Sequence, residues 1–158
     1  MRDSNLNIAI FSPSQNPYSE TFIQAHKNYL RDKVYYYYGS GKNIKLENVG
    51  LLTSKVQRLK LKIISKLFKK SSSYIWRNPL LKSLKKQHID VVLVEYGTHA
   101  HHLIETLKQS KLPFVVHFHG YDASVRTIIE NNNNYKEVFK YASKIIAVSN
   151  KMANMLVK

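Results

Sequence analysis

The chain has no cysteine among its 158 residues, which excludes disulfide bonds and thiolate metal sites. It also lacks an apolar run of the roughly 18 residues that a membrane-spanning helix needs. Residues 1–7 lack the apolar region of a secretory signal, so we expect a cytoplasmic protein. The length and a hydrophobic fraction of 44% fit one soluble domain, covering residues 1–158, with its own core.

Acidic residues are scarce and unevenly placed. The chain has 10 Asp and Glu against 25 Lys and Arg, for a formal net charge of +15. No acidic residue lies between Glu47 and Asp90, where eleven of the basic residues are found. This balance favours an anionic partner, such as nucleic acid, an acidic membrane surface or a phosphorylated substrate. The clustering assigns the charge to one segment of the domain.

Five short apolar runs, each ended by polar or turn-forming residues, are typical of buried strands. They cover residues 7–11, 34–38, 90–95, 113–118 and 144–148. Helical periodicity follows at residues 19–30, 100–110 and 135–141, and again after Ser149, a helix-capping residue. The pattern predicts a single Rossmann-like α/β domain, with a mainly parallel sheet of five strands or slightly more and helices on both faces.

Open parallel sheets bind ligands beyond the carboxyl ends of their strands. The residues that follow the predicted strands are polar or rich in glycine, as at 12–16, 39–41, 95–99 and 119–122. We therefore expect a ligand site along this edge. No G-x-G-x-x-G or Walker motif accompanies it, which disfavours a dinucleotide site.

Four segments at these strand ends resemble one known family. Residues 14–23 (SQNPYSETFI) are similar to N-P-S-E-T-F-I, and residues 90–98 (DVVLVEYGT) to D-x-V-H-x-H-F-G. Residues 112–122 (LPFVVHFHGYD) are similar to I-P-x-V-x-x-x-H-G-x-D, and residues 142–149 (ASKIIAVS) to A-D-x-V-I-A-V-S. In this order they resemble the N-terminal, acceptor-binding domain of glycosyltransferase family 4, retaining enzymes of the GT-B fold that build bacterial surface polysaccharides.

The resemblance implies the acceptor-binding half of an enzyme that transfers a sugar from a nucleotide-sugar to a glycan or lipid-linked acceptor. In such enzymes a C-terminal domain holds the donor, and we expect that domain to be absent from residues 1–158. The isolated chain is then expected to have little or no transfer activity, and to need no metal or other cofactor. At Glu95 the chain departs from the histidine often found in the family.

His119 is the predicted catalytic residue, because it follows a strand and its near-neutral pKa suits a sugar hydroxyl or a phosphate. The resemblance implies that this histidine contacts the reacting sugar. Gly120 would let the backbone approach the ligand, and residues 14–21 lie at a helix N-terminus that attracts anions. The alternatives are a packed histidine and ordinary helix capping. The predicted substrate-binding residues are Ser14, Gln15, Glu20, Thr21, Glu95, Gly120 and Asp122.

A metal-dependent hydrolase is a competing hypothesis, since imidazole is a common metal ligand. Such a site needs further ligands on other strand ends, where Glu95 and Asp122 are the carboxylates that the sequence offers. We expect no metal here. The histidines that motivate this alternative are His99, His101, His102, His117 and His119.

The basic segment, about residues 53–88, contains apolar residues near helical spacing with lysines between them. This pattern predicts an amphipathic helix that holds the protein at the inner face of the plasma membrane; the alternative is a helix packed on the sheet. Nucleic acid is disfavoured because aromatic residues do not alternate with the basic ones. A second hypothesis for the whole chain is a non-catalytic basic module that docks on an anionic membrane or a partner protein. The predicted membrane-surface residues are Lys55, Arg58, Lys62, Lys66, Lys69, Lys70 and Trp76.

Overall fold

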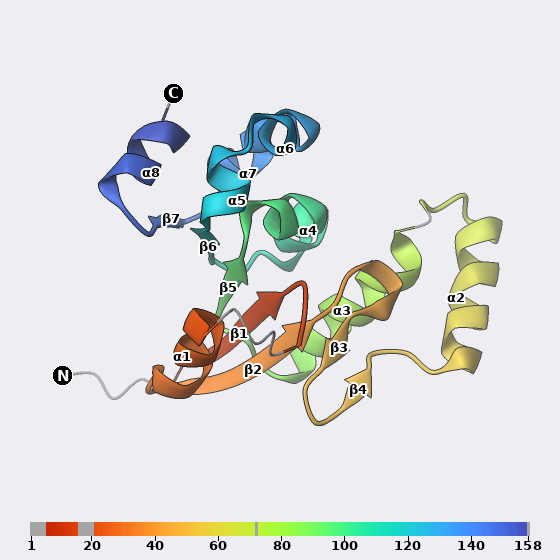
Figure 1. The fold of residues 1–158 in the computed structure, drawn as a ribbon. Helices are drawn as coiled ribbons and strands as arrows, with labels where there is room; N and C mark the ends of the chain where they lie inside the picture. The colour runs from red at the N-terminus through yellow and green to blue at the C-terminus, as the bar shows by residue number, and fades with distance from the viewer. Residues whose placement is uncertain (1–5, 16–20, 72, 158) are drawn as a thin grey trace.

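A computed structural model describes residues 6–15, 21–71 and 73–157 (Figure 1). Within them a seven-stranded sheet has the order β4-β3-β2-β1-β5-β6-β7. Its strands are β1 (Asn7–Ser12), β2 (Lys33–Tyr38), β3 (Lys45–Leu46), β4 (Gly50–Leu51), β5 (Val91–Glu95), β6 (Phe114–Phe118) and β7 (Lys144–Ala147). The neighbours among β2, β1, β5, β6 and β7 pair in parallel, which confirms the predicted sheet. The antiparallel strands β3 and β4 extend one edge, and each is too short to give a periodic signal.

Helices connect the parallel strands, as the alternating pattern predicts. They are α1 (Thr21–Tyr29), α2 (Lys55–Leu67), α3 (Tyr74–Lys86), α4 (Gly97–Ser110), α5 (Gly120–Ser124), α6 (Arg126–Asn131), α7 (Lys136–Tyr141) and α8 (Asn150–Leu156). Two short 3₁₀ turns are η1 (Gly41–Asn43) and η2 (Asn133–Tyr135). Ser149 caps α8 as predicted, since its Oγ accepts a hydrogen bond from the Met152 backbone N–H at 3.2 Å. None of the helices in the described ranges is long and apolar enough to cross a bilayer.

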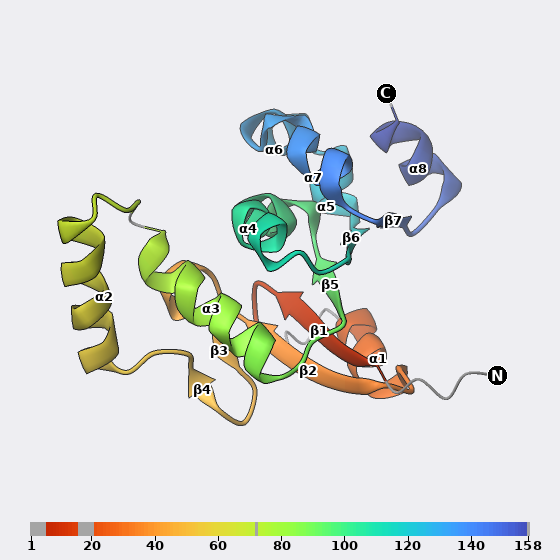
Figure 2. The same cartoon turned by 180° about the vertical axis from the view of Figure 1, so that it is seen from behind.

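Helices lie on both faces of the sheet (Figures 1 and 2), which confirms the predicted two-sided arrangement. Apolar side chains pack on each face. On one face, sheet residues such as Phe11 and Val94 pack with Leu80 of α3 and Leu103 of α4. On the other face, Ile23 of α1 packs on a smaller cluster from β1 and β2 that includes Ile8, Ile10 and Tyr36. These two layers fix where α1 lies relative to the strand ends.

The order of the strands sets the position of the ligand edge. From β1 the chain moves to β2 on one side, and it then returns to place β5, β6 and β7 on the other side of β1. The sheet therefore has its topological switch point between β1 and β5, where open α/β sheets form a crevice beyond the carboxyl ends of the strands.

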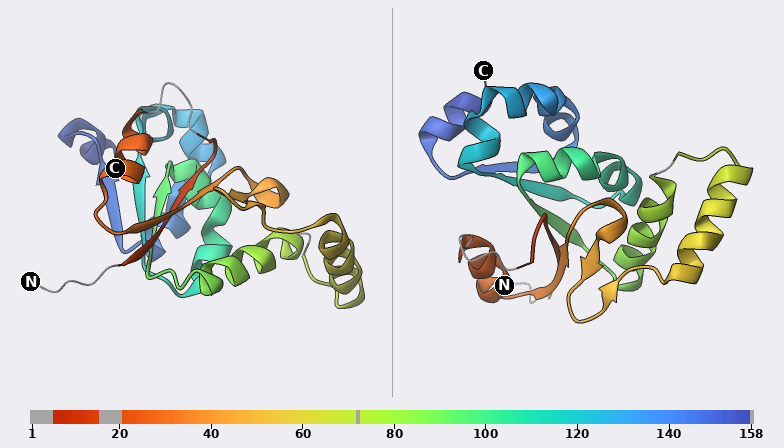
Figure 3. Two further views of the ribbon diagram at one scale, coloured as in Figure 1. Left: turned by 90° about the horizontal axis from the view of Figure 1, so that it is seen from below. Right: turned by 45° about the vertical axis from the view of Figure 1, so that its right-hand side comes forward.

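Helix α2 lies outside α3, at the edge of the molecule (Figures 1 and 3). Its start is fixed by a capping box in which the Gln57 N–H donates to Ser54 Oγ (3.2 Å) and the Ser54 N–H donates to Gln57 Oε1 (3.0 Å). The helix packs against α3. The predicted amphipathic helix is thus present, but it stands off the sheet.

Candidate functional site

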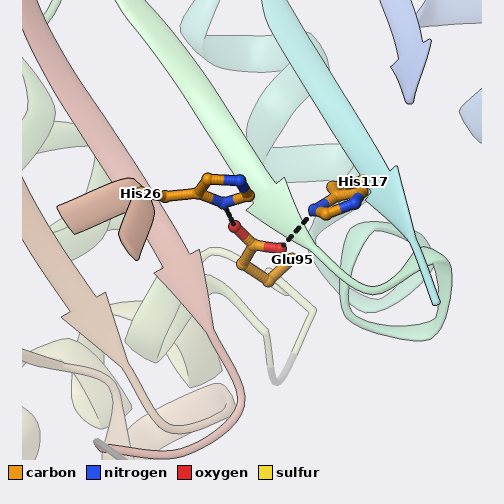
Figure 4. A group of neighbouring side chains, drawn as sticks. All are labelled: His26, Glu95 and His117. Carbon is orange, nitrogen blue, oxygen red and sulfur yellow. Dashed lines mark hydrogen bonds and ion pairs between the residues drawn. The ribbon is translucent and has the colours of Figure 1, made fainter. Parts of the chain in front are cut away.

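A single carboxylate gathers three imidazoles at the switch point. Glu95, the last residue of β5, has no exposed surface, and its side-chain oxygens accept three hydrogen bonds. The donors are His26 Nδ1 (2.7 Å, to Oε1), His117 Nδ1 (3.1 Å, to Oε2) and His119 Nε2 (3.0 Å, to Oε2). Figure 4 shows His26 and His117 on either side of the Glu95 carboxylate. We call these four residues the Glu95 cluster.

Three elements bring the Glu95 cluster together. His117 on β6 stands opposite Glu95 in the parallel register, so their side chains share one face of the sheet. His119 follows two residues later, just beyond the end of β6. His26 comes from α1, the helix after β1, and its partner Glu95 is 69 residues away in sequence. The cluster thus joins the carboxyl ends of neighbouring strands, as the switch-point rule predicts.

The hydrogen bonds decide the charge of the cluster. Burial alone would raise the pKa of Glu95, but the bonds from His117, His119 and His26 outweigh burial and hold that pKa well below its usual range. The same contact raises the pKa of His26 above its ordinary value. His26 is also the most exposed of the three imidazoles, with 31% of its side-chain surface accessible. An ionised carboxylate therefore faces a histidine that gains a proton readily.

Aromatic rings enclose His119. Its imidazole stacks on the Phe22 ring at 4.3 Å between centroids, and Tyr96 lies against it at 4.4 Å. Tyr96 has φ +73°, a backbone conformation that costs a bulky residue on the order of 1–3 kcal/mol. Such strain concentrates at functional sites. The turn between β5 and α4 thus holds Tyr96 in an unfavourable conformation next to His119.

Asp122 positions the backbone beneath the cluster. It is completely buried, and one oxygen accepts from the His119 N–H at 2.7 Å while the other accepts from the Gly97 N–H. Burial raises the pKa of Asp122, against the effect of these backbone donors. The carboxyl group thereby links the start of α4 to the start of α5. It also explains why α4 begins at Gly97, three residues before the predicted start, because the capping group comes from a distant part of the chain.

The other predicted substrate-binding residues lie along the same edge or on its surface. Ser14 and Gln15 follow β1, and the Ser14 carbonyl accepts a hydrogen bond from the Tyr36 hydroxyl at 2.9 Å. Thr21 is exposed at the first position of α1. Glu20 lies outside the described residues.

Burial separates the remaining predictions into two groups. Gly120 is exposed, and a Cβ atom at this position would meet no atom within 4 Å, so the backbone is open to a ligand. Glu95 and Asp122 have no exposed surface. Both carboxylates, which the sequence predicts to bind substrate, lie behind other groups of the edge. Glu95 accepts hydrogen bonds from His26 and His119. Asp122 accepts from the backbone N–H groups at the starts of α4 and α5.

His26 is the member of the cluster that sequence reasoning missed. Its helical spacing in residues 19–30 indicated packing, and nothing local shows that it reaches a carboxylate 69 residues away. The available signal is that His26 follows Phe22 by four residues, so both side chains lie on one face of α1. Phe22 contacts His119, and this face of α1 therefore belongs to the site.

The histidines of the competing metal hypothesis do not assemble as a group. His99 is buried in α4, and burial lowers its pKa to about 3, while His102 stacks on Trp76 at 5.4 Å. Within the described part of the chain, the residues close enough to share an ion are His26, Glu95 and His117, with ligand atoms within 4.8 Å of one another. Two imidazoles and a carboxylate are ligands that zinc accepts.

A mainly parallel α/β sheet with a polar cluster at its switch point defines this protein as a Rossmann-like α/β domain. A family model described as Glycosyltransferase Family 4 matches residues 19–158. The chain therefore belongs to glycosyltransferase family 4, which confirms the resemblance of its four strand-end segments. Compared with curated proteins, the chain has no significant match.

Proposed function

We propose that this chain is the acceptor-binding half of a retaining glycosyltransferase. Together with a donor-binding domain, it transfers a sugar from a nucleotide-sugar to a glycan or lipid-linked acceptor in surface polysaccharide synthesis, at the inner face of the plasma membrane. Family membership supports the reaction class. The observation that carries the site is the Glu95 cluster, which meets the open backbone of Gly120 at the ligand edge of the sheet.

The cluster offers groups that suit a sugar and a phosphate. His119 contacts the reacting sugar from the floor of the site, between the rings of Phe22 and Tyr96. The more exposed His26, whose pKa is raised by Glu95, presents an imidazolium to a phosphate of the donor or of a lipid-linked acceptor. A few polar groups among aromatic walls are typical of small-molecule sites.

Transfer assays with the protein joined to its donor domain test this function. Labelled nucleotide-sugars are offered one at a time with a membrane lipid extract, and incorporation into lipid or glycan is measured. We expect one donor to support transfer and His119→Ala to lower the rate by about 10²-fold or more. His102→Ala is the matched control, because this exposed histidine lies on α4 against Trp76, and its rate should equal that of the unmodified protein.

Two outcomes would contradict the proposal in different ways. An unchanged rate in His119→Ala would show that the catalytic residue is assigned wrongly. No incorporation from any donor by the unmodified protein would reject the transferase and favour the non-catalytic binding module.

A further inference from the structure

We propose that α2 binds the surface of an anionic lipid bilayer through an apolar stripe formed by Val56, Leu59, Ile63 and Leu67. This surface rests on the membrane location given in the proposed function and names the residues that would provide it, but it depends on no residue of the Glu95 cluster. It also differs from the sequence expectation, which did not say which side of the helix would face outward.

The apolar stripe is turned away from the protein. Its four residues are three or four positions apart, as one face of an α-helix requires, and their side chains are 59% to 73% exposed. The face that packs inward carries Arg58, Leu61 and Ser65, which are partly or fully buried. Arg58 donates from Nη2 to the Lys42 carbonyl (2.7 Å), and Ser65 Oγ donates to the Lys70 carbonyl (3.0 Å). A helix that packs on a core has the reverse arrangement, with its apolar face inside.

Exposed lysines flank the apolar stripe on both sides. Lys55, Lys62 and Lys66 lie along one side and Lys60 along the other, as their spacing on the helix requires. Residues 48–89 contain no acidic side chain to neutralise them. Lysines can lay their methylene stems along apolar surface while the ammonium groups reach outward. An apolar stripe between two basic borders is the pattern of a helix that lies in a membrane interface.

Charge complementarity selects an anionic bilayer as the partner. A second copy of the chain would bring its own lysine borders against these, and the like charges would repel. A bilayer instead offers acidic headgroups to the lysines and hydrocarbon to the stripe. The capping box at Ser54 and Gln57 holds α2 in helical form without the stripe being packed, so little ordering is left for binding.

Two predicted membrane-surface residues are not part of this surface. Arg58 is held by hydrogen bonds to the Thr53 hydroxyl (3.1 Å) and to the Lys42 carbonyl (2.7 Å). Trp76 lies on α3, where it stacks on His102. Lys69 and Lys70 follow the helix and are exposed, so they add positive charge at its C-terminal end.

Vesicle co-sedimentation with the full chain tests the apolar stripe. We compare vesicles of phosphatidylcholine with vesicles of phosphatidylcholine and phosphatidylglycerol in roughly equal parts, and expect about tenfold more binding to the anionic vesicles at low salt. The double variant Leu59→Ser/Ile63→Ser should lose about tenfold of this binding. The matched control Val148→Ser/Val157→Ser removes apolar side chains that are 60% and 86% exposed elsewhere, and it should bind as the unmodified chain does.

Charge variants test the lysine border in the same assay. Lys55→Gln/Lys62→Gln/Lys66→Gln should abolish most of the binding, whereas Lys136→Gln/Lys144→Gln/Lys151→Gln, which changes the net charge equally at exposed positions, should keep it. All variants replace exposed residues, and far-ultraviolet circular dichroism confirms that each remains folded.

Three results would overturn the proposal. Equal binding to neutral and anionic vesicles rejects an anionic partner. Equal loss of vesicle binding in the two triple Lys→Gln variants would show that binding depends on net charge and not on the lysines beside the apolar stripe. If the stripe variant binds vesicles normally but changes the sedimentation coefficient, the surface serves self-association instead. His119→Ala should bind vesicles normally, so failure of this proposal is distinguishable from failure of the transferase function.

Discussion

At the scale of single residues, Glu95 determines the character of the site. A buried, ionised carboxylate is stable only when it is paired and hydrogen-bonded, and here three imidazoles satisfy it. In return it fixes which nitrogen of each ring faces inward, so the outward edges of His26 and His119 are defined. Glu95 is therefore the centre of the cluster.

The His26–Glu95 contact makes a testable contribution to folding stability. The pKa of His26 is raised above 6.5, so its contribution is complete below pH 6.5 and is lost as the pH rises through the raised value. The pKa of Glu95 is lowered, so its contribution is present above pH 4.5 and is lost as the pH falls below it. The cluster should therefore stabilise the fold most between pH 4.5 and pH 6.5.

Urea unfolding of the unmodified chain and of His26→Gln, over a range of pH, measures this contribution. The difference in unfolding free energy should reach a few tenths to about 1 kcal/mol near pH 5 to 6 and shrink above neutral pH. A difference that grows above neutral pH would contradict the His26–Glu95 pairing.

At the scale of elements, two glycines at helix starts have different surroundings. Gly97 lets α4 pack closely on the sheet, and Gly120 leaves the backbone at the start of α5 exposed. A Cβ atom at Gly97 would overlap the ring of Phe118, whereas one at Gly120 meets nothing within 4 Å. Neither glycine has a left-handed backbone conformation. Substitution by alanine therefore causes no backbone strain at either position, and its effect depends on the space available for the methyl group. The site therefore rests on a tight contact at α4 and an open backbone at α5.

Alanine substitutions at these glycines should affect different properties, stability at Gly97 and transfer rate at Gly120. Gly97→Ala should lower the unfolding free energy by about 1–3 kcal/mol, because α4 must shift from Phe118. Gly120→Ala should change stability by no more than about 0.5 kcal/mol but lower the transfer rate, because its methyl group occupies the ligand's path. Thermal unfolding and transfer assays on both variants measure this. A Gly120→Ala protein with full activity would remove Gly120 from the site.

The same elements show what sequence could predict. The five parallel strands and α1, α2, α4, α7 and α8 have strong periodicity, so the sequence predicts them. Strands β3 and β4 have two residues each and leave no periodic trace. The role of His26 and the start of α4 depend on partners far along the chain, Glu95 and Asp122, which local patterns cannot reveal.

At the scale of the whole molecule, the two surfaces to which we assign functions are separated in space. The Glu95 cluster lies at the switch point of the sheet, and α2 projects from its β4 side beyond α3 (Figures 1 and 3). The formal net charge of +15 is concentrated between Glu47 and Asp90, around α2 and α3. An anionic surface could therefore hold the protein by α2 without involving the residues that we assign to the acceptor.

Residues 1–158 alone should bind but not transfer. We propose that a second domain holds the donor. The isolated chain should then transfer sugar at less than about one-thousandth of the rate of a protein that carries both domains, since the reactants are no longer held together. Incorporation assays at equal protein concentration compare the two. Equal rates would place the donor site within these residues.

We propose that Glu95 organises the catalytic edge of this glycosyltransferase family 4 domain. The most direct test of this proposal is the rate of sugar transfer by the two-domain protein carrying Glu95→Gln, an isosteric change that removes the charge shared by His26, His117 and His119. We expect a fall in kcat of about 10²-fold with the donor KM unchanged. A kcat within about twofold of the unmodified protein, in a variant that remains folded, would contradict it.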